Sequence, residues 1–136
     1  MLRSVILAAA RSPRVEQLVE TTPLTRDVVK RFVAGVTDAD AVRVAGRLVA
    51  DGFQVSLDHL GEDTLASDQA ERNKDAYLSL LTALSGAQLT AAVEVSVKLS
   101  ALGQKLDEKL AYEYARIICA TAQERGTTVT LDAKLA

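Results

Sequence analysis

The sequence predicts an α/β fold in which helices alternate with short parallel strands. From residue 37 onward, three segments carry apolar residues at helical spacing, and each is followed by a short segment that alternates apolar and polar residues. The connections between successive strands are long and contain a helix, and such a crossover joins parallel strands. We therefore expect the order αβαβαβ and a parallel sheet, preceded by an N-terminal helical arm.

Composition and charge indicate one globular domain and exclude some partners. The 136 residues suit a single domain, and 49% hydrophobic with 25% charged residues is typical of a folded chain. A net charge of −2 argues against nucleic acid as a partner. No apolar run reaches the ~18 residues that cross a bilayer. Cys119 is the only cysteine, so no internal disulfide can form, which fits a reducing cytosol.

Residues 1–35 are expected to form the helical arm. Ser12-Pro13 can open one short helix, because the fixed φ of proline suits a first turn. Thr25 can cap a second helix that ends near Gly35, and "TTP" between the two predicts a turn. The short apolar run at the start faintly resembles a signal peptide, but the amphipathic pattern after it favours the arm.

The first helix and strand of the regular part begin at residue 37. Thr37 is a good N-cap, with acidic residues in the positive first turn, and Gly52 ends the helix. The segment "FQVSLD" at 53–58 then alternates as a half-buried strand does. Its apolar side carries Phe53, Val55 and Leu57, and its polar side carries Gln54, Ser56 and Asp58.

The second helix and strand follow the same pattern. Ser67 can cap a helix that breaks at Gly86. The apolar residues on one face of this helix are Tyr77, Leu80, Leu81 and Leu84. In "VEVSVKLSALG" at 93–103, valines alternate with polar residues, and Lys98 falls on the polar side just before the apolar end.

The third helix and strand complete the regular part. Asp107 can cap a helix with Gly126 past its end, and Cys119 lies beside the apolar stripe of that helix, where packing is its expected role. The segment "TVTLD" at 128–132 alternates valine and leucine with polar residues and ends in Asp132.

Each predicted strand has one apolar and one polar side. Strands of a doubly wound parallel sheet are instead apolar on both sides, because helices cover both faces. Two arrangements explain the alternation. Either helices cover one face and water the other, or the sheet closes into a barrel whose polar interior leads to an active-site mouth.

A charged residue ends the polar side of each strand, namely Asp58, Lys98 and Asp132. In a parallel sheet these positions lie at the same edge, so we expect a lysine between two carboxylates. One interpretation is a structural ion-pair cluster at the end of the sheet. The other is a cationic Lys98 that receives an anionic substrate group or a flavin oxygen.

The loop after the first strand, "HLGED", offers Glu62 and Asp63 at the same edge. A functional role and a merely solvated loop both fit these two residues. His59 has no second candidate ligand at metal-site spacing, so we expect no metal site.

Four motifs occur together in the order and spacing of one enzyme family: "RFVAG" at 31–35, "SLDHLGED" at 56–63, "VSVKLSALG" at 95–103 and "VTLDA" at 129–133. On these motifs the chain resembles the proline dehydrogenase family, especially its short monofunctional actinobacterial type. The resemblance runs from about residue 24 to residue 133. It covers only the first part of the catalytic domain of that family.

The resemblance implies a fold and an activity. Residues 36–136 would form part of a (βα)8 TIM barrel, truncated after the third strand. The family is FAD-dependent and oxidises L-proline to 1-pyrroline-5-carboxylate by moving a hydride to the flavin. Reduced flavin then passes electrons to a membrane quinone. A cytoplasmic location, free or peripheral at the inner face of the membrane, follows from the resemblance.

The resemblance also implies roles for four residues. Lys98 corresponds to the family lysine that binds the substrate carboxylate and lies close to the flavin. Asp132 corresponds to the active-site aspartate that ends the third strand and helps bind substrate. Asp58 corresponds to the catalytic-site aspartate after the first strand, and Glu62 to the glutamate that pairs with a late arginine when the site closes.

The chain departs from the family at its end, where "DAKLA" replaces an acidic run and Lys134 stands at the place of a carboxylate. Three strands cannot close a barrel. We therefore expect the 136 residues alone to have little or no activity, not to retain FAD, and to self-associate or swap elements. The alternative is a non-catalytic α/β assembly module in which Asp58, Lys98 and Asp132 form a structural salt-bridge cluster.

Overall fold

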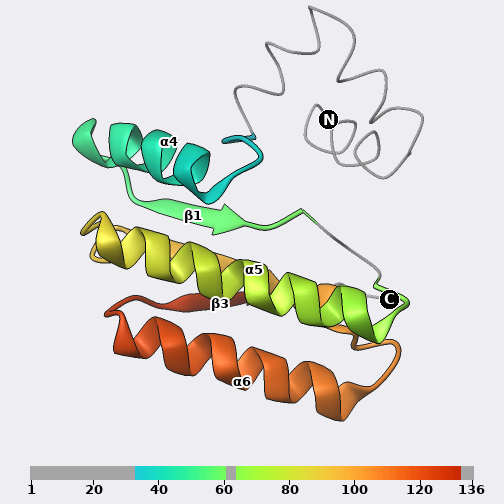
Figure 1. Ribbon diagram of the computed structural model, residues 1–136. Helices are drawn as coiled ribbons and strands as arrows, with labels where there is room; N and C mark the ends of the chain where they lie inside the picture. Colours follow the sequence, from blue (N-terminus) through green and yellow to red (C-terminus); the bar gives the residue numbers. More distant parts are fainter. Residues whose placement is uncertain (1–32, 61–63, 133–136) are drawn as a thin grey trace, which may run out of the picture. The chain divides into compact units, whose positions relative to one another are not determined.

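The computed structural model describes residues 33–60 and 64–132 of the chain (Figure 1). The chain divides into two units between Gly35 and Val36. All helices and strands described below belong to the second unit. Of the expected arm over residues 1–35, all but the last three residues lie outside the described part of the chain.

Helices and strands alternate in the order that the sequence predicts. The elements are α4 (Asp38–Ala50), β1 (Val55–Asp58), α5 (Ser67–Gly86), β2 (Val93–Lys98), the 3-10 helix η1 (Leu99–Leu102), α6 (Glu108–Glu124) and β3 (Val129–Asp132). The strands form one parallel sheet in the order β1-β2-β3. The α/β fold class with three parallel strands is therefore confirmed.

The three helices lie on one side of the sheet (Figure 1). The valines of β2 are buried among side chains of α5 and α6, whereas the residues between them are half-buried. The opposite side, which we call the polar face, carries Ser56, Asp58, Glu94, Ser96, Lys98, Thr130 and Asp132. In the described residues, the alternation thus separates a helix-covered side from a polar one.

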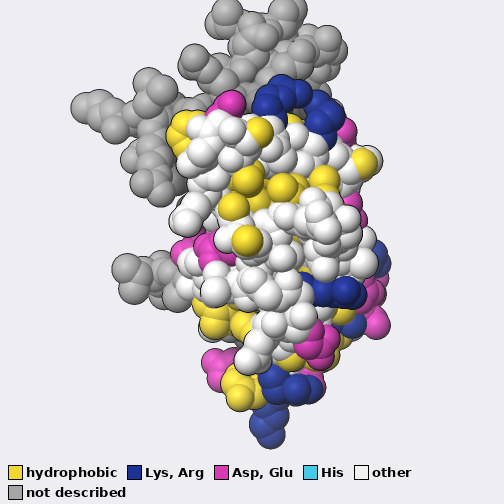
Figure 2. All heavy atoms as spheres, turned by 90° about the vertical axis from the view of Figure 1, so that its left-hand side faces the viewer, with side chains coloured by type: hydrophobic (Ala, Val, Ile, Leu, Met, Phe, Trp, Pro, Cys, Tyr) yellow, Lys and Arg dark blue, Asp and Glu magenta, His cyan; other side chains and the backbone are white. Residues whose placement is uncertain are grey.

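The hydrophobic core lies between the sheet and the helices. Its largest fully buried apolar side chains are Tyr77, Leu81, Leu84, Leu102, Ile118, Val93, Val95 and Val97. Figure 2 looks at the end of the molecule where the strands begin, and there hydrophobic side chains gather with charged ones around them. The charged ends of the strands lie at the other end.

Side-chain caps fix the starts of two helices as expected. The Thr37 hydroxyl accepts from the amide of Asp40 at 3.1 Å, and the Asp40 carboxylate accepts from the amide of Thr37 at 3.3 Å, which is a capping box. Asp107 caps α6 by accepting from two backbone amides. The cap expected at Ser67 is wrong, because the helix starts with this residue and Ala66 occupies the N-cap.

A buried polar network holds the chain before α5 instead. The Asn73 amide donates to the carbonyl of Ala101 at 2.8 Å and to the Thr64 hydroxyl at 3.1 Å, and that hydroxyl donates to the same carbonyl at 3.1 Å. Gln69 donates to the Asn73 side chain from the helix surface. Asn73 is 1% exposed, so its bonds are protected from water. The network ties η1, the turn that follows Lys98, to α5.

Replacement of Asn73 should therefore cost more than its size suggests. We expect Asn73→Ala to lower the free energy of unfolding by about 2–3 kcal/mol, because the Ala101 carbonyl loses its amide donor in a buried place. Urea denaturation followed by circular dichroism measures this. The control Gln69→Ala, at the outer end of the network, should cost less than about 1 kcal/mol. Equal losses in the two variants would contradict the role given to Asn73.

Candidate functional site

The three strands end at one edge of the sheet, and each ends in a charged residue. Asp58, Lys98 and Asp132 are the last residues of β1, β2 and β3. The register places Lys98 opposite Asp132, whereas Asp58 lies opposite Ser96, two residues earlier in β2. Lys98 is thus the last residue of its strand, and Leu99 already begins η1. Parallel pairing brings the three predicted residues to the same edge.

Lys98 forms an ion pair with Asp58 at this edge. Its Nζ lies 3.3 Å from Oδ2 of Asp58, and the side chains are 21% and 34% exposed. No ion pair joins Lys98 to Asp132 within the described ranges, although the two are register partners. Asp132 ends the edge strand and is exposed to solvent. The structure therefore places Lys98 on the middle strand between Asp58 and Asp132, and of these two carboxylates Asp58 forms the ion pair.

Tyr77 of α5 contacts Asp58 of this ion pair from the helix side of the sheet. Its hydroxyl lies 3.0 Å from Oδ1 of Asp58 and 2.9 Å from the carbonyl of Ser96, and it can donate to either. It also accepts from the amide of His59 at 3.3 Å. Burial, and after it the charge of Asp58, raises the pKa of Tyr77. The phenol therefore stays protonated and acts as a donor.

The apolar stripe of the second helix predicts Tyr77 only as a core residue. The structure shows that its ring does lie in the core, with 0% exposure, while its hydroxyl belongs to the charged edge. A tyrosine, rather than a phenylalanine or leucine, at the centre of a buried stripe is the signal that could have indicated this role, because a buried hydroxyl needs a partner.

A second polar cluster, the Glu94 cluster, lies on the polar face nearer the start of the strands. Hydroxyls from both neighbouring segments donate to the Glu94 carboxylate: Thr130 at 2.6 Å, Thr128 at 2.7 Å and Ser56 at 3.1 Å. The hydroxyls of Thr130 and Thr128 hold the pKa of Glu94 below its ordinary value. One carboxylate thus cross-links β2 to β1 and to the β3 side of the sheet.

Three candidate residues near the strand ends that were considered from sequence lie outside the described part of the chain, namely Glu62, Asp63 and Lys134. His59 packs its ring edge-on against Tyr77, with 5.8 Å between ring centres. In the described ranges, no three His, Cys, Asp or Glu side chains are grouped as a metal site would need. None of the helices there has the length and apolar character to span a membrane.

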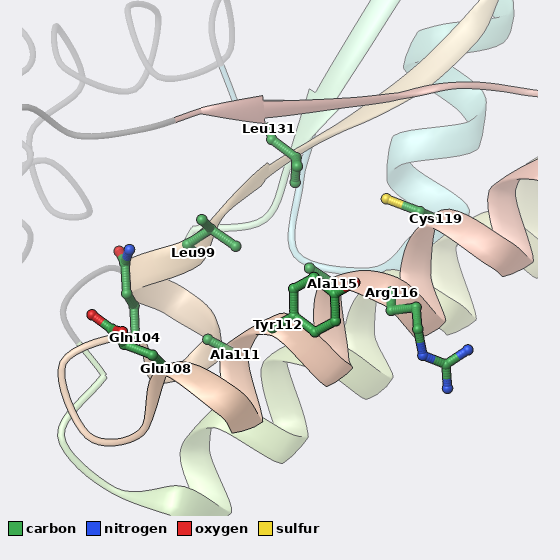
Figure 3. A pocket seen from close by; sticks show the side chains of 9 residues that line it. All are labelled: Leu99, Gln104, Glu108, Ala111, Tyr112, Ala115, Arg116, Cys119 and Leu131. Atoms are coloured by element: carbon green, nitrogen blue, oxygen red, sulfur yellow. The ribbon is translucent and has the colours of Figure 1, made fainter.

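An apolar groove lies on the helix side of the sheet, away from the polar face (Figure 3). It has a volume of about 430 Å³ and is lined by Leu99, Gln104, Glu108, Ala111, Tyr112, Ala115, Arg116, Cys119 and Leu131. Leu131 lies on the apolar side of β3 as predicted but is still 51% exposed, because α6 covers it from one side only. The groove does not contain Lys98 or Asp58.

Comparisons with known proteins agree on one family. The family model described as proline dehydrogenase matches residues 41–135. Proline dehydrogenase 1 of Bacillus subtilis (strain 168) is 31% identical over 132 residues, which are 97% of this chain and 43% of that protein. Proline dehydrogenase of Deinococcus radiodurans is 33% identical over 135 residues, 97% of this chain and 42% of that protein. The chain thus spans less than half the length of these relatives.

A solved structure with a similar fold is that of proline utilization A (PutA) from Bdellovibrio bacteriovorus, inactivated by N-propargylglycine. It superposes with a TM-score of 0.68 and 24% identity, over 82% of this chain and 14% of that one. This likeness concerns the fold alone. It agrees with the interpretation that the described elements resemble the first part of a (βα)8 barrel.

The Glu94 cluster should make stability depend on pH. Because its folded-state pKa lies below the ordinary value of 4.5, Glu94 stabilises the fold above about pH 4.5, and this contribution is lost as the pH falls through the lowered pKa. We expect Glu94→Gln to lower the free energy of unfolding by about 1–2 kcal/mol at pH 7, because a neutral amide accepts hydrogen bonds from these hydroxyls less strongly than a carboxylate does. It should also flatten the acid limb of a plot of unfolding free energy against pH.

The matched control is Glu124→Gln, which replaces an exposed glutamate at the end of α6. It should change the stability at pH 7 by less than about 0.5 kcal/mol, because Glu124 is an exposed residue outside the Glu94 cluster. A Glu94→Gln variant with an unaltered acid limb would contradict the assignment.

Proposed function

The chain belongs to the proline dehydrogenase family, an oxidoreductase family, and on that premise we propose that it supplies one side of the site in which L-proline is oxidised to 1-pyrroline-5-carboxylate. Since the chain spans 43% and 42% of two relatives, the activity is proposed for a domain that contains these residues together with the rest of such a protein.

The observation that supports this proposal is the half-buried Lys98 ammonium at the carboxyl-terminal edge of a parallel sheet. Enzymes with such sheets and barrels bind their ligands at this edge. An ammonium has three donors, so it can bind a carboxylate while it keeps its contact with Asp58. We infer that Lys98 receives the carboxylate of proline.

The remaining predicted residues receive roles that complement Lys98. Asp58 holds the ammonium in place, and Asp132, exposed at the same edge, contributes negative charge beside the cationic amine of proline. Glu62 is proposed to pair with an arginine from a later part of the domain. A substrate bound by its carboxylate has its ring oriented, which is the main contribution a binding residue can make to rate.

FAD is the proposed cofactor, and when bound it supplies the acceptor for the hydride that leaves the ring carbon next to nitrogen. The charged edge fits such a group in part, because Lys98 offers a half-buried cation to an electron-rich oxygen. The three described strands offer no other cationic side chain on the polar face. Most of the contacts that bind FAD would therefore come from later parts of the domain.

The proposed electron acceptor of such a complete domain is a membrane quinone. Electrons would then leave the protein at a membrane surface, which fits a cytoplasmic protein that is free or peripheral at the inner face of that membrane.

A structural role is the second candidate, and the Lys98–Asp58–Tyr77 contacts favour it, since partly buried ion pairs with a buried hydrogen-bond donor also hold folds together. In that case the chain would be a non-catalytic assembly module. The exposed Asp132 argues against a closed three-residue plug, because one of its members takes no part in the ion pair.

Lys98→Met separates the two candidates. If Lys98 binds substrate, the variant should change the free energy of unfolding of the 136-residue chain by only about 1 kcal/mol, because the pair is partly exposed. It should reduce proline-dependent dye reduction at least about a hundredfold, the effect of a lost substrate-orienting contact. The activity is measured in a chimera in which this chain replaces the matching part of Deinococcus radiodurans proline dehydrogenase. A stability loss of about 3–5 kcal/mol with turnover retained would favour the structural role.

The 136-residue chain alone should show little or no dye reduction with proline and added FAD. Its purified form should be colourless, and light scattering should detect self-association through the edge of β3 and the half-exposed Leu131. A yellow preparation, measurable turnover, or a monodisperse monomer with a sharp thermal transition would contradict these expectations.

A further inference from the structure

We propose that Tyr77 is a positioning residue for the candidate site and acts through Asp58 to fix the Lys98 ammonium. The inference deepens the proposed function and rests on it where Lys98 is said to receive the substrate carboxylate. The geometric part, that a buried phenol controls the position of Lys98, stands on contacts within the described residues alone.

The first argument is the place of the Tyr77 hydroxyl. The side chain is 0% exposed, and the ring is surrounded by the hydrophobic core on the helix side of the sheet. A phenylalanine would fill the same space. The hydroxyl therefore adds nothing to apolar packing, and its burial carries a cost that only its hydrogen-bond partners offset.

The second argument concerns the hydrogen-bond partners of the Tyr77 hydroxyl. The amide of His59, just after β1, donates to the hydroxyl oxygen, and this leaves the hydroxyl proton for an acceptor. The two acceptors are Oδ1 of Asp58 at the end of β1 and the carbonyl of Ser96 in β2. Tyr77 thus joins the ends of two neighbouring strands at the position two residues before Lys98.

The third argument concerns the two oxygens of Asp58. Oδ1 faces the phenol and Oδ2 faces the Lys98 ammonium at 3.3 Å. When the phenol donates its proton to Oδ1, the carboxylate is held through both oxygens and loses its freedom to rotate, so the ammonium has one preferred place rather than several. Because Tyr77 is fully buried, it acts on a ligand at the polar face only through Asp58 and Lys98.

The test observes Lys98 directly. The chimera that carries this chain within Deinococcus radiodurans proline dehydrogenase is labelled with ¹⁵N-lysine, and the side-chain ammonium signal of Lys98 is assigned by its loss in Lys98→Met. Tyr77→Phe keeps the ring and removes only the hydroxyl. We expect it to shift the Lys98 signal and to raise the rate at which its protons exchange with water by roughly fivefold, as for the loss of one hydrogen bond.

Two controls separate positioning from a general loosening of the fold. Tyr114→Phe removes a phenol hydroxyl from α6, where the ring contacts Lys74, and should leave the Lys98 signal unchanged. In an Asp58→Asn background, Tyr77→Phe should have little further effect on Lys98, because the connecting carboxylate is already gone. A folded Tyr77→Phe chain with an unchanged Lys98 signal overturns the proposal, as does a full effect in the Asp58→Asn background.

Kinetics in the chimera with the Deinococcus radiodurans protein distinguish this inference from the proposed function. Tyr77→Phe should lower kcat/KM for proline by roughly fivefold, since it loosens the group that binds the carboxylate and thereby orients the ring. An unchanged kcat/KM overturns the positioning role. A wild-type chimera that folds but does not oxidise proline would contradict the proposed function, while the exchange rate of Lys98 still decides the role of Tyr77.

Discussion

Parallel pairing of three strands is the constraint on which the rest of this structure depends. Because β1, β2 and β3 run in one direction, the residue that ends each strand comes to a common edge. Helices on one side of the sheet bury the apolar residues of β2 and partly cover those of β1 and β3. The charged half is thereby confined to the other side, where Lys98 and Asp58 meet. A cationic group at the carboxyl-terminal edge is a consequence of topology and alternation together.

A polar face of this kind is stable only if its groups satisfy one another. Two carboxylates, Glu94 and Asp58, satisfy polar groups at different positions along the strands. Near the beginning, Glu94 accepts hydroxyls from both neighbouring segments and so holds the strands in register. At the end, Asp58 is shared between Lys98 and the phenol of Tyr77. The Glu94 cluster cross-links the strands, and Asp58 contacts Lys98, the group proposed to bind the substrate.

The sequence predicts what depends on local pattern and misses what depends on register. The helix that starts after Asp107 follows from its capping residue, whereas Ser67 looks like a cap but is the first residue of α5, after the N-cap Ala66. Alternation predicts that the charged residues at the strand ends lie at one edge. It does not predict which of them form an ion pair. Lys98 binds Asp58 on the neighbouring strand, and Asp132 stays in solvent. The hydroxyl of Tyr77 reaches this edge from α5. Helical periodicity alone predicts only that the Tyr77 side chain is a core residue.

The separation of the paired strands along the chain has a consequence for how the protein acquires its structure during synthesis. Ser56 and Glu94 touch across 38 residues, and Thr130 meets the same glutamate across 36. When a nascent chain has emerged only as far as β1, the strand β2 with which it pairs has not yet been made, because α5 lies between them in the chain. The helices can form from local contacts, but the sheet requires closure of two long loops. Until β2 emerges from the ribosome, β1 lacks the neighbour that it has in the described sheet.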